Sequence, residues 1–105
     1  MRLSPRDPEV PNRLINLGVA ELGLGHFDAA VAQFQKAIDA GAHYFIPYVT
    51  MASAYALEGK MEEAQAALAE ARRLNPQLTV TWLTAHAPDV PPLFDGLRKA
   101  GLPEQ

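Results

Sequence analysis

The chain has 105 residues, a formal net charge of −3 and no cysteine, with 49 % hydrophobic and 20 % charged residues. This composition is typical of one small folded domain rather than of a disordered chain. The acidic balance argues against a nucleic-acid module, which needs a basic face, and the missing cysteines exclude disulfides, thiolate nucleophiles and cysteine metal sites.

Residues 1–10 are interpreted as the end of a preceding repeat or as a linker, because Leu3-Ser4-Pro5 resembles Leu74-Asn75-Pro76. No apolar stretch follows the arginines at this terminus, so we expect no signal peptide. The uncharged run from residue 40 to residue 57 is barely of membrane length and contains Gly41 and Pro47. We therefore expect a turn and a buried helix rather than a membrane span, and a cytoplasmic protein without membrane contact.

A shift of 34 residues aligns the chain with itself. At aligned positions, small residues coincide with small ones and large apolar residues with large ones, whereas polar residues differ. This pattern indicates a packing constraint. The matched pairs are Ala20/Ala54, Gly25/Gly59, Ala30/Ala64, Ala32/Ala66, Ala37/Ala71, Leu14/Tyr48, Leu17/Met51, Phe27/Met61 and Phe34/Leu68. A third copy starts near Trp82 and breaks off. We predict repeats at 11–44 and 45–78, followed by a partial third repeat and a C-terminal cap at 79–105.

Within each copy the apolar residues recur at helical steps of three and four. Gly23–His26 and Gly59-Lys60 each separate two such stripes, and Asn75-Pro76 ends the second copy. Each repeat should therefore be a helical hairpin. The residues assigned to its packing are Leu17, Ala30, Phe34, Met51, Tyr55, Ala64, Leu68 and Trp82.

These residues resemble the tetratricopeptide repeat, a pair of antiparallel helices with a period of 34 residues. The pattern reads Leu14-x-x-Leu17-Gly18-x-x-Glu21 with Ala30-x-x-x-Phe34-x-x-Ala37, and again Tyr48-x-x-Met51-Ala52-x-x-Tyr55 with Ala64-x-x-x-Leu68-x-x-Ala71. Glu21 and Ala42 depart from the tyrosine and proline usual in the family. The resemblance implies an all-α solenoid of two hairpins stacked in a right-handed superhelix, then a capping helix and a short terminal helix.

Both ends of the chain show a second resemblance. Residues Arg2–Pro8 and Gly96–Glu104 are similar to the C-terminal repeat region of bacterial class III adenylate/guanylate cyclase-like signalling proteins. This resemblance implies a regulatory segment of a larger protein. The metal-binding aspartates and nucleotide-binding strands of a cyclase domain are missing from the sequence, so no catalytic residue is carried over.

The histidines do not form a catalytic or metal-binding pattern. His26 and His43 fall in predicted turns, and His86 falls at a helix crossing, with no pair at metal-ligand spacing. We expect a non-enzymatic protein without a cofactor or metal.

The predicted functional surface is a neutral, half-apolar concave groove lined by the first helix of each hairpin. The residues assigned to it are Asn12, Ile15, Asn16, Val19, Ile46, Val49, Thr50, Ser53, Val80 and Leu83. Family members that clamp the acidic tails of chaperones use basic residues and asparagines there. The matching sites here are Ile15, Val19, Thr50, Val80 and Thr84, so we expect no carboxylate clamp.

Three occupants of this groove remain open. The first is a peptide or helix of a partner protein, or another domain of the parent protein, docked by apolar anchors. The second is the chain's own segment with Leu93, Phe94 and Leu97, and the third is a second copy of the chain at the solenoid ends. A different class of function is a small-molecule sensor, in which Tyr44, Tyr48, Tyr55 and His86 would converge in a closed pocket that controls an attached catalytic domain.

Overall fold

The computed structural model of the chain describes residues 9–42, 44–86 and 91–105. In this part the fold is all-α, with six helices and no strand. The helices are α1 (Glu9–Gly23), α2 (Phe27–Asp39), α3 (Ile46–Leu57), α4 (Met61–Leu74), α5 (Val80–His86) and α6 (Pro91–Ala100). The structure does not describe residues 1–8 or the turn residue His43. The predictions made from Leu3-Ser4-Pro5 and from Arg2–Pro8 therefore lie outside the described residues.

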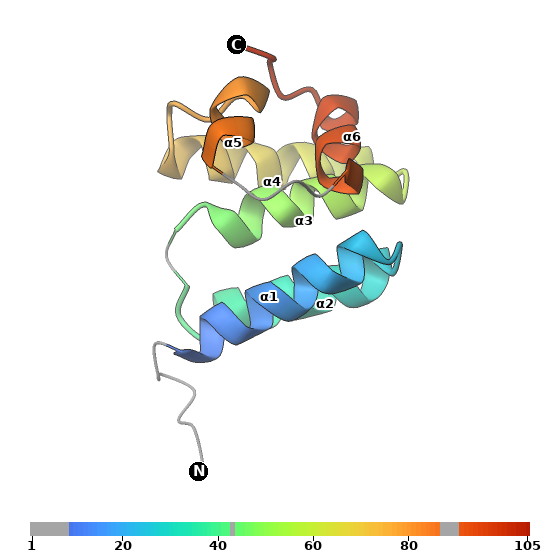
Figure 1. Cartoon of the computed structure of the whole chain (residues 1–105), viewed down its shortest axis with the longest axis vertical. Coiled ribbons are helices and arrows are strands. Elements are labelled where there is room, and N and C mark those ends of the chain that lie inside the picture. The colour runs from blue at the N-terminus through green and yellow to red at the C-terminus, as the bar shows by residue number, and fades with distance from the viewer. Residues whose placement is uncertain (1–8, 43, 87–90) are drawn as a thin grey trace.

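The first four helices form two antiparallel hairpins, α1/α2 and α3/α4, stacked along the long axis of the molecule (Figure 1). Each hairpin turns at a glycine with positive φ, 81° at Gly25 and 80° at Gly59. These two residues are 34 positions apart, so the repeat in the sequence is also a repeat of the turn geometry. A side chain with a Cβ is strained in this conformation, which explains the glycine at both sites.

Small residues let the helices approach closely at the hairpin crossings. Ala30, Ala52 and Ala64 are fully buried. At Gly18 a Cβ would lie 2.7 Å from Cδ1 of Phe34, so the aromatic ring takes the space that the missing side chain leaves. These contacts confirm that the alternation of small and large residues reflects packing.

Leu17 was assigned to the core, and this prediction is wrong. Its side chain is 53 % exposed, whereas that of Met51, its counterpart 34 residues later, is 6 % exposed. Met51 faces Gln35 and Ile38 of α2, the second helix of the preceding hairpin. In the described chain no helix lies at the corresponding position before α1, so about half of the Leu17 side chain stays exposed.

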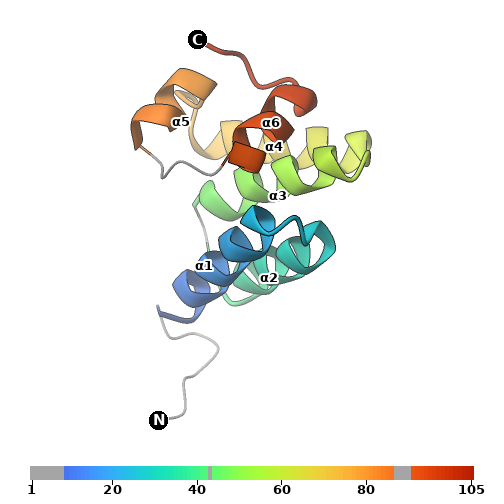
Figure 2. The ribbon, with the colours of Figure 1, turned by 45° about the vertical axis from the view of Figure 1, so that its right-hand side comes forward.

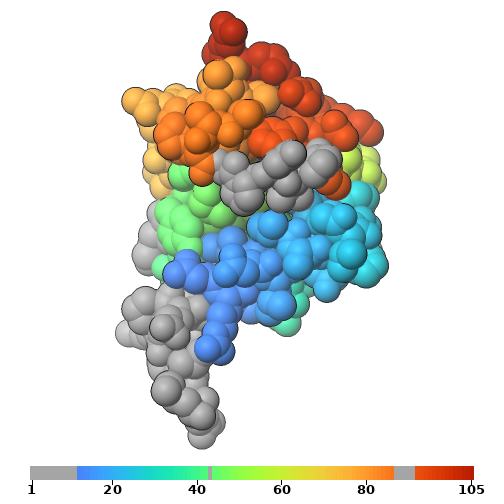
Figure 3. All heavy atoms as spheres, viewed as in Figure 1, coloured from blue at the N-terminus to red at the C-terminus, as the bar shows by residue number. Residues whose placement is uncertain are grey.

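The C-terminal part closes the end of the stack. Helix α6 lies against α3 in both ribbon views (Figures 1 and 2), and α5 and α6 together form a layer above α3 in the space-filling view (Figure 3). The backbone N–H groups of Val80 and Thr81 donate to the carbonyls of Pro103 and Glu104, each at 2.9 Å. The last residues therefore hold the beginning of α5, and Gly101, with φ 100°, follows the end of α6 in a conformation that suits glycine.

Candidate functional site

The ten residues predicted to line the groove lie on α1, α3 and α5, and most of them are covered. Six are buried (Ile15, Val49, Thr50, Ser53, Val80 and Leu83), two are half-buried (Val19 and Ile46), and two are exposed (Asn12 and Asn16). The eight on α1 and α3 form the surface that we call the first-helix face.

Helix α6 occupies the first-helix face over α3. The hydroxyl of Ser53 donates to the carbonyl of Leu93 at 2.8 Å and lies 3.2 Å from that of Pro92. A Cβ on Gly96 would lie 2.8 Å from Cα of Ser53 and still closer to its Oγ and carbonyl oxygen, so the two helices touch backbone to backbone here. Of the open alternatives, the structure shows coverage by the chain's own C-terminal segment.

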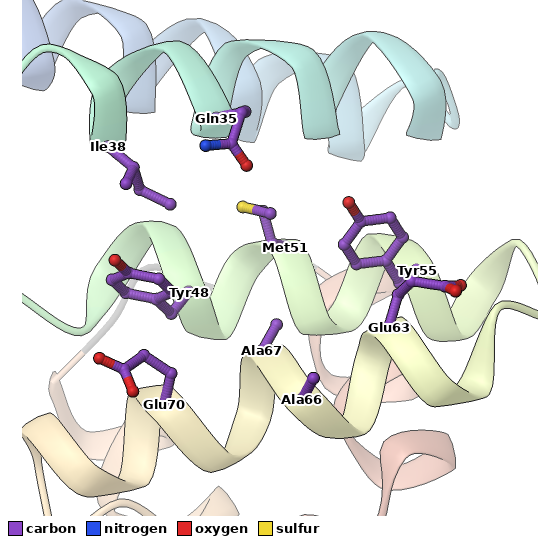
Figure 4. A pocket seen from close by; sticks show the side chains of 9 residues that line it. All are labelled: Gln35, Ile38, Tyr48, Met51, Tyr55, Glu63, Ala66, Ala67 and Glu70. Atoms are coloured by element: carbon purple, nitrogen blue, oxygen red, sulfur yellow. The ribbon is translucent and has the colours of Figure 1, made fainter.

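The opposite side of α3 faces a hollow. At about 100° per residue, Tyr48, Met51 and Tyr55 fall on the side of α3 away from Ser53. They form the floor of an open hollow of about 400 Å³ between α2 and α4, which we call the α2–α4 crevice (Figure 4). Its lining residues are Gln35, Ile38, Tyr48, Met51, Tyr55, Glu63, Ala66, Ala67 and Glu70.

The rim of the crevice on α4 is acidic. Glu70 accepts hydrogen bonds from Arg73, with Nε of Arg73 3.0 Å from Oε2 and Nη2 bonded to Oε1. Hydrogen bonding by this guanidinium lowers the pKa of Glu70 below its ordinary value, so the carboxylate is ionised at neutral pH. No ion pair to Glu63 is formed by the residues that the structure describes.

The sequence contains a signal for this crevice in the spacing of its tyrosines and glutamates. Tyr48 and Tyr55 are seven residues apart on one helix, and Glu63 and Glu70 are seven apart on the next. Seven residues are two helical turns, so each pair lies on one face of its helix. The sequence-based predictions place Tyr55 in the packing of its hairpin and both tyrosines in a ligand pocket, and neither prediction describes this crevice.

A second group of charges lies where the tips of the two hairpins meet. Glu58 lines a small hollow with residues 25–29, and its Oε1 is buried without a hydrogen-bond partner among the described residues. Burial raises the pKa of Glu58 from its ordinary value, the nearby Asp28 carboxylate raises it further, and Lys60 opposes the rise. Beside this group, exposed His26 contacts Glu21 at 2.7 Å.

A comparison with protein families decides what this architecture is. The model of the tetratricopeptide repeat matches residues 12–40 and 47–78, which together make up more than half of the chain. The chain belongs to the tetratricopeptide repeat family. Repeats of this family generally mediate protein–protein interaction and are typically non-catalytic.

The other comparisons add no relative: no curated protein and no solved structure matches the chain. The connection to cyclase-like proteins therefore has no support from a homologue. None of the helices that the structure describes is long and apolar enough to cross a membrane.

The four residues of the sensor hypothesis are not brought together in this tetratricopeptide domain. Tyr48 and Tyr55 line the crevice, but the hydroxyl of Tyr44 donates to Oδ1 of Asn12 at 2.8 Å. His86 stacks on Trp82 with ring centroids 4.1 Å apart. Within the described ranges, no three His, Asp or Glu residues are placed to hold a metal ion.

Proposed function

We propose that this tetratricopeptide domain is a non-enzymatic protein-interaction module that holds a segment of a partner protein in the α2–α4 crevice. The observation that carries the proposal is the contrast between the two sides of α3. The chain's own α6 covers one side, whereas aromatic and aliphatic side chains on the other side line an open hollow. Concave sites with an apolar floor and a few polar groups are typical binding sites.

The first-helix face is the other candidate surface, and its contact with α6, a short helix of the same chain, supports it as a surface for helices. A partner would first have to displace α6 and the residues after it, a segment that buries Leu93 and Leu97 of the helix and Leu102 behind it. Three buried leucines contribute about 5–9 kcal/mol, comparable with the whole stability of a small domain, roughly 5–15 kcal/mol. The energetic cost favours the crevice, which needs no such displacement.

Two finer hypotheses stay predictions. Attachment to a cyclase-like signalling protein rests only on the resemblance of the terminal segments. Sensing of a small molecule would place the ligand at Tyr48 and Tyr55 without Tyr44 or His86, in a hollow that is open rather than closed.

The proposal is tested with dodecapeptides selected from a random library on the immobilised domain. The blocking variant is Ala66→Phe, because Ala66 is an exposed lining residue whose replacement fills the crevice. The matched control is Ala32→Phe, at the equivalent exposed position one repeat earlier, outside the crevice. We expect selected peptides to bind the wild type and the Ala32 variant equally and to lose about tenfold or more in affinity for the Ala66 variant, a change of about 1.4 kcal/mol.

Amide NMR spectra locate the bound peptide independently. Shifts at Gln35, Met51 and Ala66 support the crevice. Shifts confined to Asn12, Asn16 and Val19, or peptides that bind no better than scrambled versions, contradict the proposal.

A further inference from the structure

The α2–α4 crevice contains two equivalent halves. Because α3 and α4 are antiparallel, Tyr48 lies at the same end as Glu70, and Tyr55 lies at the same end as Glu63 (Figure 4). The halves are two helical turns apart, about 10.5 Å along each helix. Each half therefore combines one tyrosine with one glutamate.

Only the glutamate of the Tyr48–Glu70 half is paired with a cation of the chain itself among the described residues. The guanidinium of Arg73 bonds to Glu70 at the outer rim of this half, where the arginine side chain is 67 % exposed. The residue seven positions before Arg73 is Ala66. The half formed by Glu63 and Tyr55 thus has an alanine where the other half has an arginine.

The floor beside this second half suits the stem of a long basic side chain. Met51 and the half-buried Tyr55 offer apolar surface and an aromatic ring, whereas Ile38 lies at the other end of the crevice, beside Tyr48 (Figure 4). Lysine and arginine bury their methylene stems on such surface, and their cationic heads are attracted to tyrosine rings and to carboxylates. No lysine or arginine is among the described residues that line the crevice.

We infer that the Glu63–Tyr55 half of the crevice receives a lysine or arginine side chain from the partner segment. This inference rests on the proposed function and specifies the chemistry of the partner: a peptide segment with a basic residue next to an apolar one. The pairing of Arg73 with Glu70 shows that a glutamate on this rim is accessible to a guanidinium group. The volume of about 400 Å³ is at the lower end of the range for ligand pockets, which fits inserted side chains rather than a whole helix.

The experiment uses the peptides selected on the domain and replaces each of their basic residues in turn by norleucine. One of these replacements should weaken binding to the wild type about three- to tenfold, the range expected for an ion pair combined with a cation–π contact. The same loss should follow from Glu63→Gln but not from Glu62→Gln, which removes the same charge from a neighbouring residue outside the crevice.

A second pair of variants introduces an arginine into the domain itself. Ala66→Arg places an arginine three residues after Glu63, as Arg73 follows Glu70, and should weaken binding of the basic peptide about three- to tenfold by pairing with Glu63 in its place. Ala32→Arg adds the same charge one repeat earlier and should leave affinity unchanged. The unfolding temperature of each variant confirms that it is folded.

The outcomes separate the inference from the proposed function. If peptides bind in the crevice but norleucine in place of every basic residue leaves affinity unchanged, the inference is wrong and the proposed function stands. If Ala66→Phe does not affect binding, the proposed function fails first. If arginine amide alone binds as tightly as the peptides, the site takes a free amine or guanidine compound and the assignment to a protein partner is overturned.

Discussion

At the scale of single residues, Glu58 is a carboxyl group held where its charge is unfavourable. Its side chain is 13 % exposed, one of its oxygens is buried without a partner among the described residues, and its neighbours include Asp28 as well as Lys60. The pKa of Glu58 is therefore above 4.5, its ordinary value. At neutral pH the folded chain holds an ionised group that would be better solvated in the unfolded chain.

Glu58→Gln should raise the free energy of unfolding at neutral pH by about 0.5–1.5 kcal/mol, because a neutral amide can donate to the Asp28 carboxylate. The pH dependence has a definite sign. As the pH falls through the raised pKa of Glu58 towards 4.5, the wild type binds a proton more readily when folded than when unfolded and gains stability. The advantage of the variant should therefore shrink in this window and vanish below it.

Urea unfolding of both proteins between neutral pH and pH about 4 measures this difference. Glu62→Gln, an exposed glutamate on the same hairpin, serves as the control and should change little at any pH. A Glu58→Gln variant that is less stable than the wild type at neutral pH would contradict this assignment.

At the scale of secondary-structure elements, the seating of α6 on α3 depends on one residue without a side chain. Gly96 approaches the backbone of Ser53 so closely that a Cβ has no space. Because part of the obstacle is backbone, a change of side-chain rotamer cannot relieve the clash. The position therefore decides whether α6 can cover the first-helix face.

We expect Gly96→Ala to lower the free energy of unfolding by about 1–3 kcal/mol, as overpacking does, although alanine favours helices over glycine by up to about 1 kcal/mol. Gly23→Ala is the matched control, since a Cβ at Gly23 meets nothing within 4 Å. That change should be neutral or stabilising by about 0.5–1 kcal/mol. Chemical denaturation of both variants checks the pair, and equal effects would show that the contact between α6 and α3 is loose.

At the scale of the whole molecule, the environment of a repeat position depends on its place in the stack. Leu17 and Met51 occupy the same position of the repeat, yet only Met51 has the second helix of a preceding hairpin against it. The described domain measures 42 × 27 × 25 Å, so a large share of its repeat positions lies at an end of the stack.

Leu17→Ala should therefore cost less than about 1 kcal/mol of unfolding free energy, whereas Met51→Ala should cost about 2–5 kcal/mol, the usual range for truncating a buried side chain. Thermal and urea unfolding of the two variants provide the comparison. A cost at Leu17 as large as that at Met51 would mean that something covers Leu17 in solution.

The same dependence explains what the sequence could predict. The hairpins, their glycine turns and the buried Phe34 follow from local periodicity and a 34-residue repeat, signals that act over short distances. The seating of α6 depends on Gly96 meeting Ser53, residues that are distant in sequence, and no local pattern pairs them. The ten residues predicted for the groove lie on α1, α3 and α5, but local periodicity carries no information about the burial of most of them or about the crevice on the far side of α3.

The matching backbone angles at Gly25 and Gly59 have a practical consequence. Because both hairpins turn with the same backbone conformation at their glycine, a duplicated 34-residue unit inserted between them should pack against both neighbours. The domain could thus be lengthened in the laboratory by inserting further 34-residue units. Each inserted unit would add another hollow between the second helices of successive hairpins.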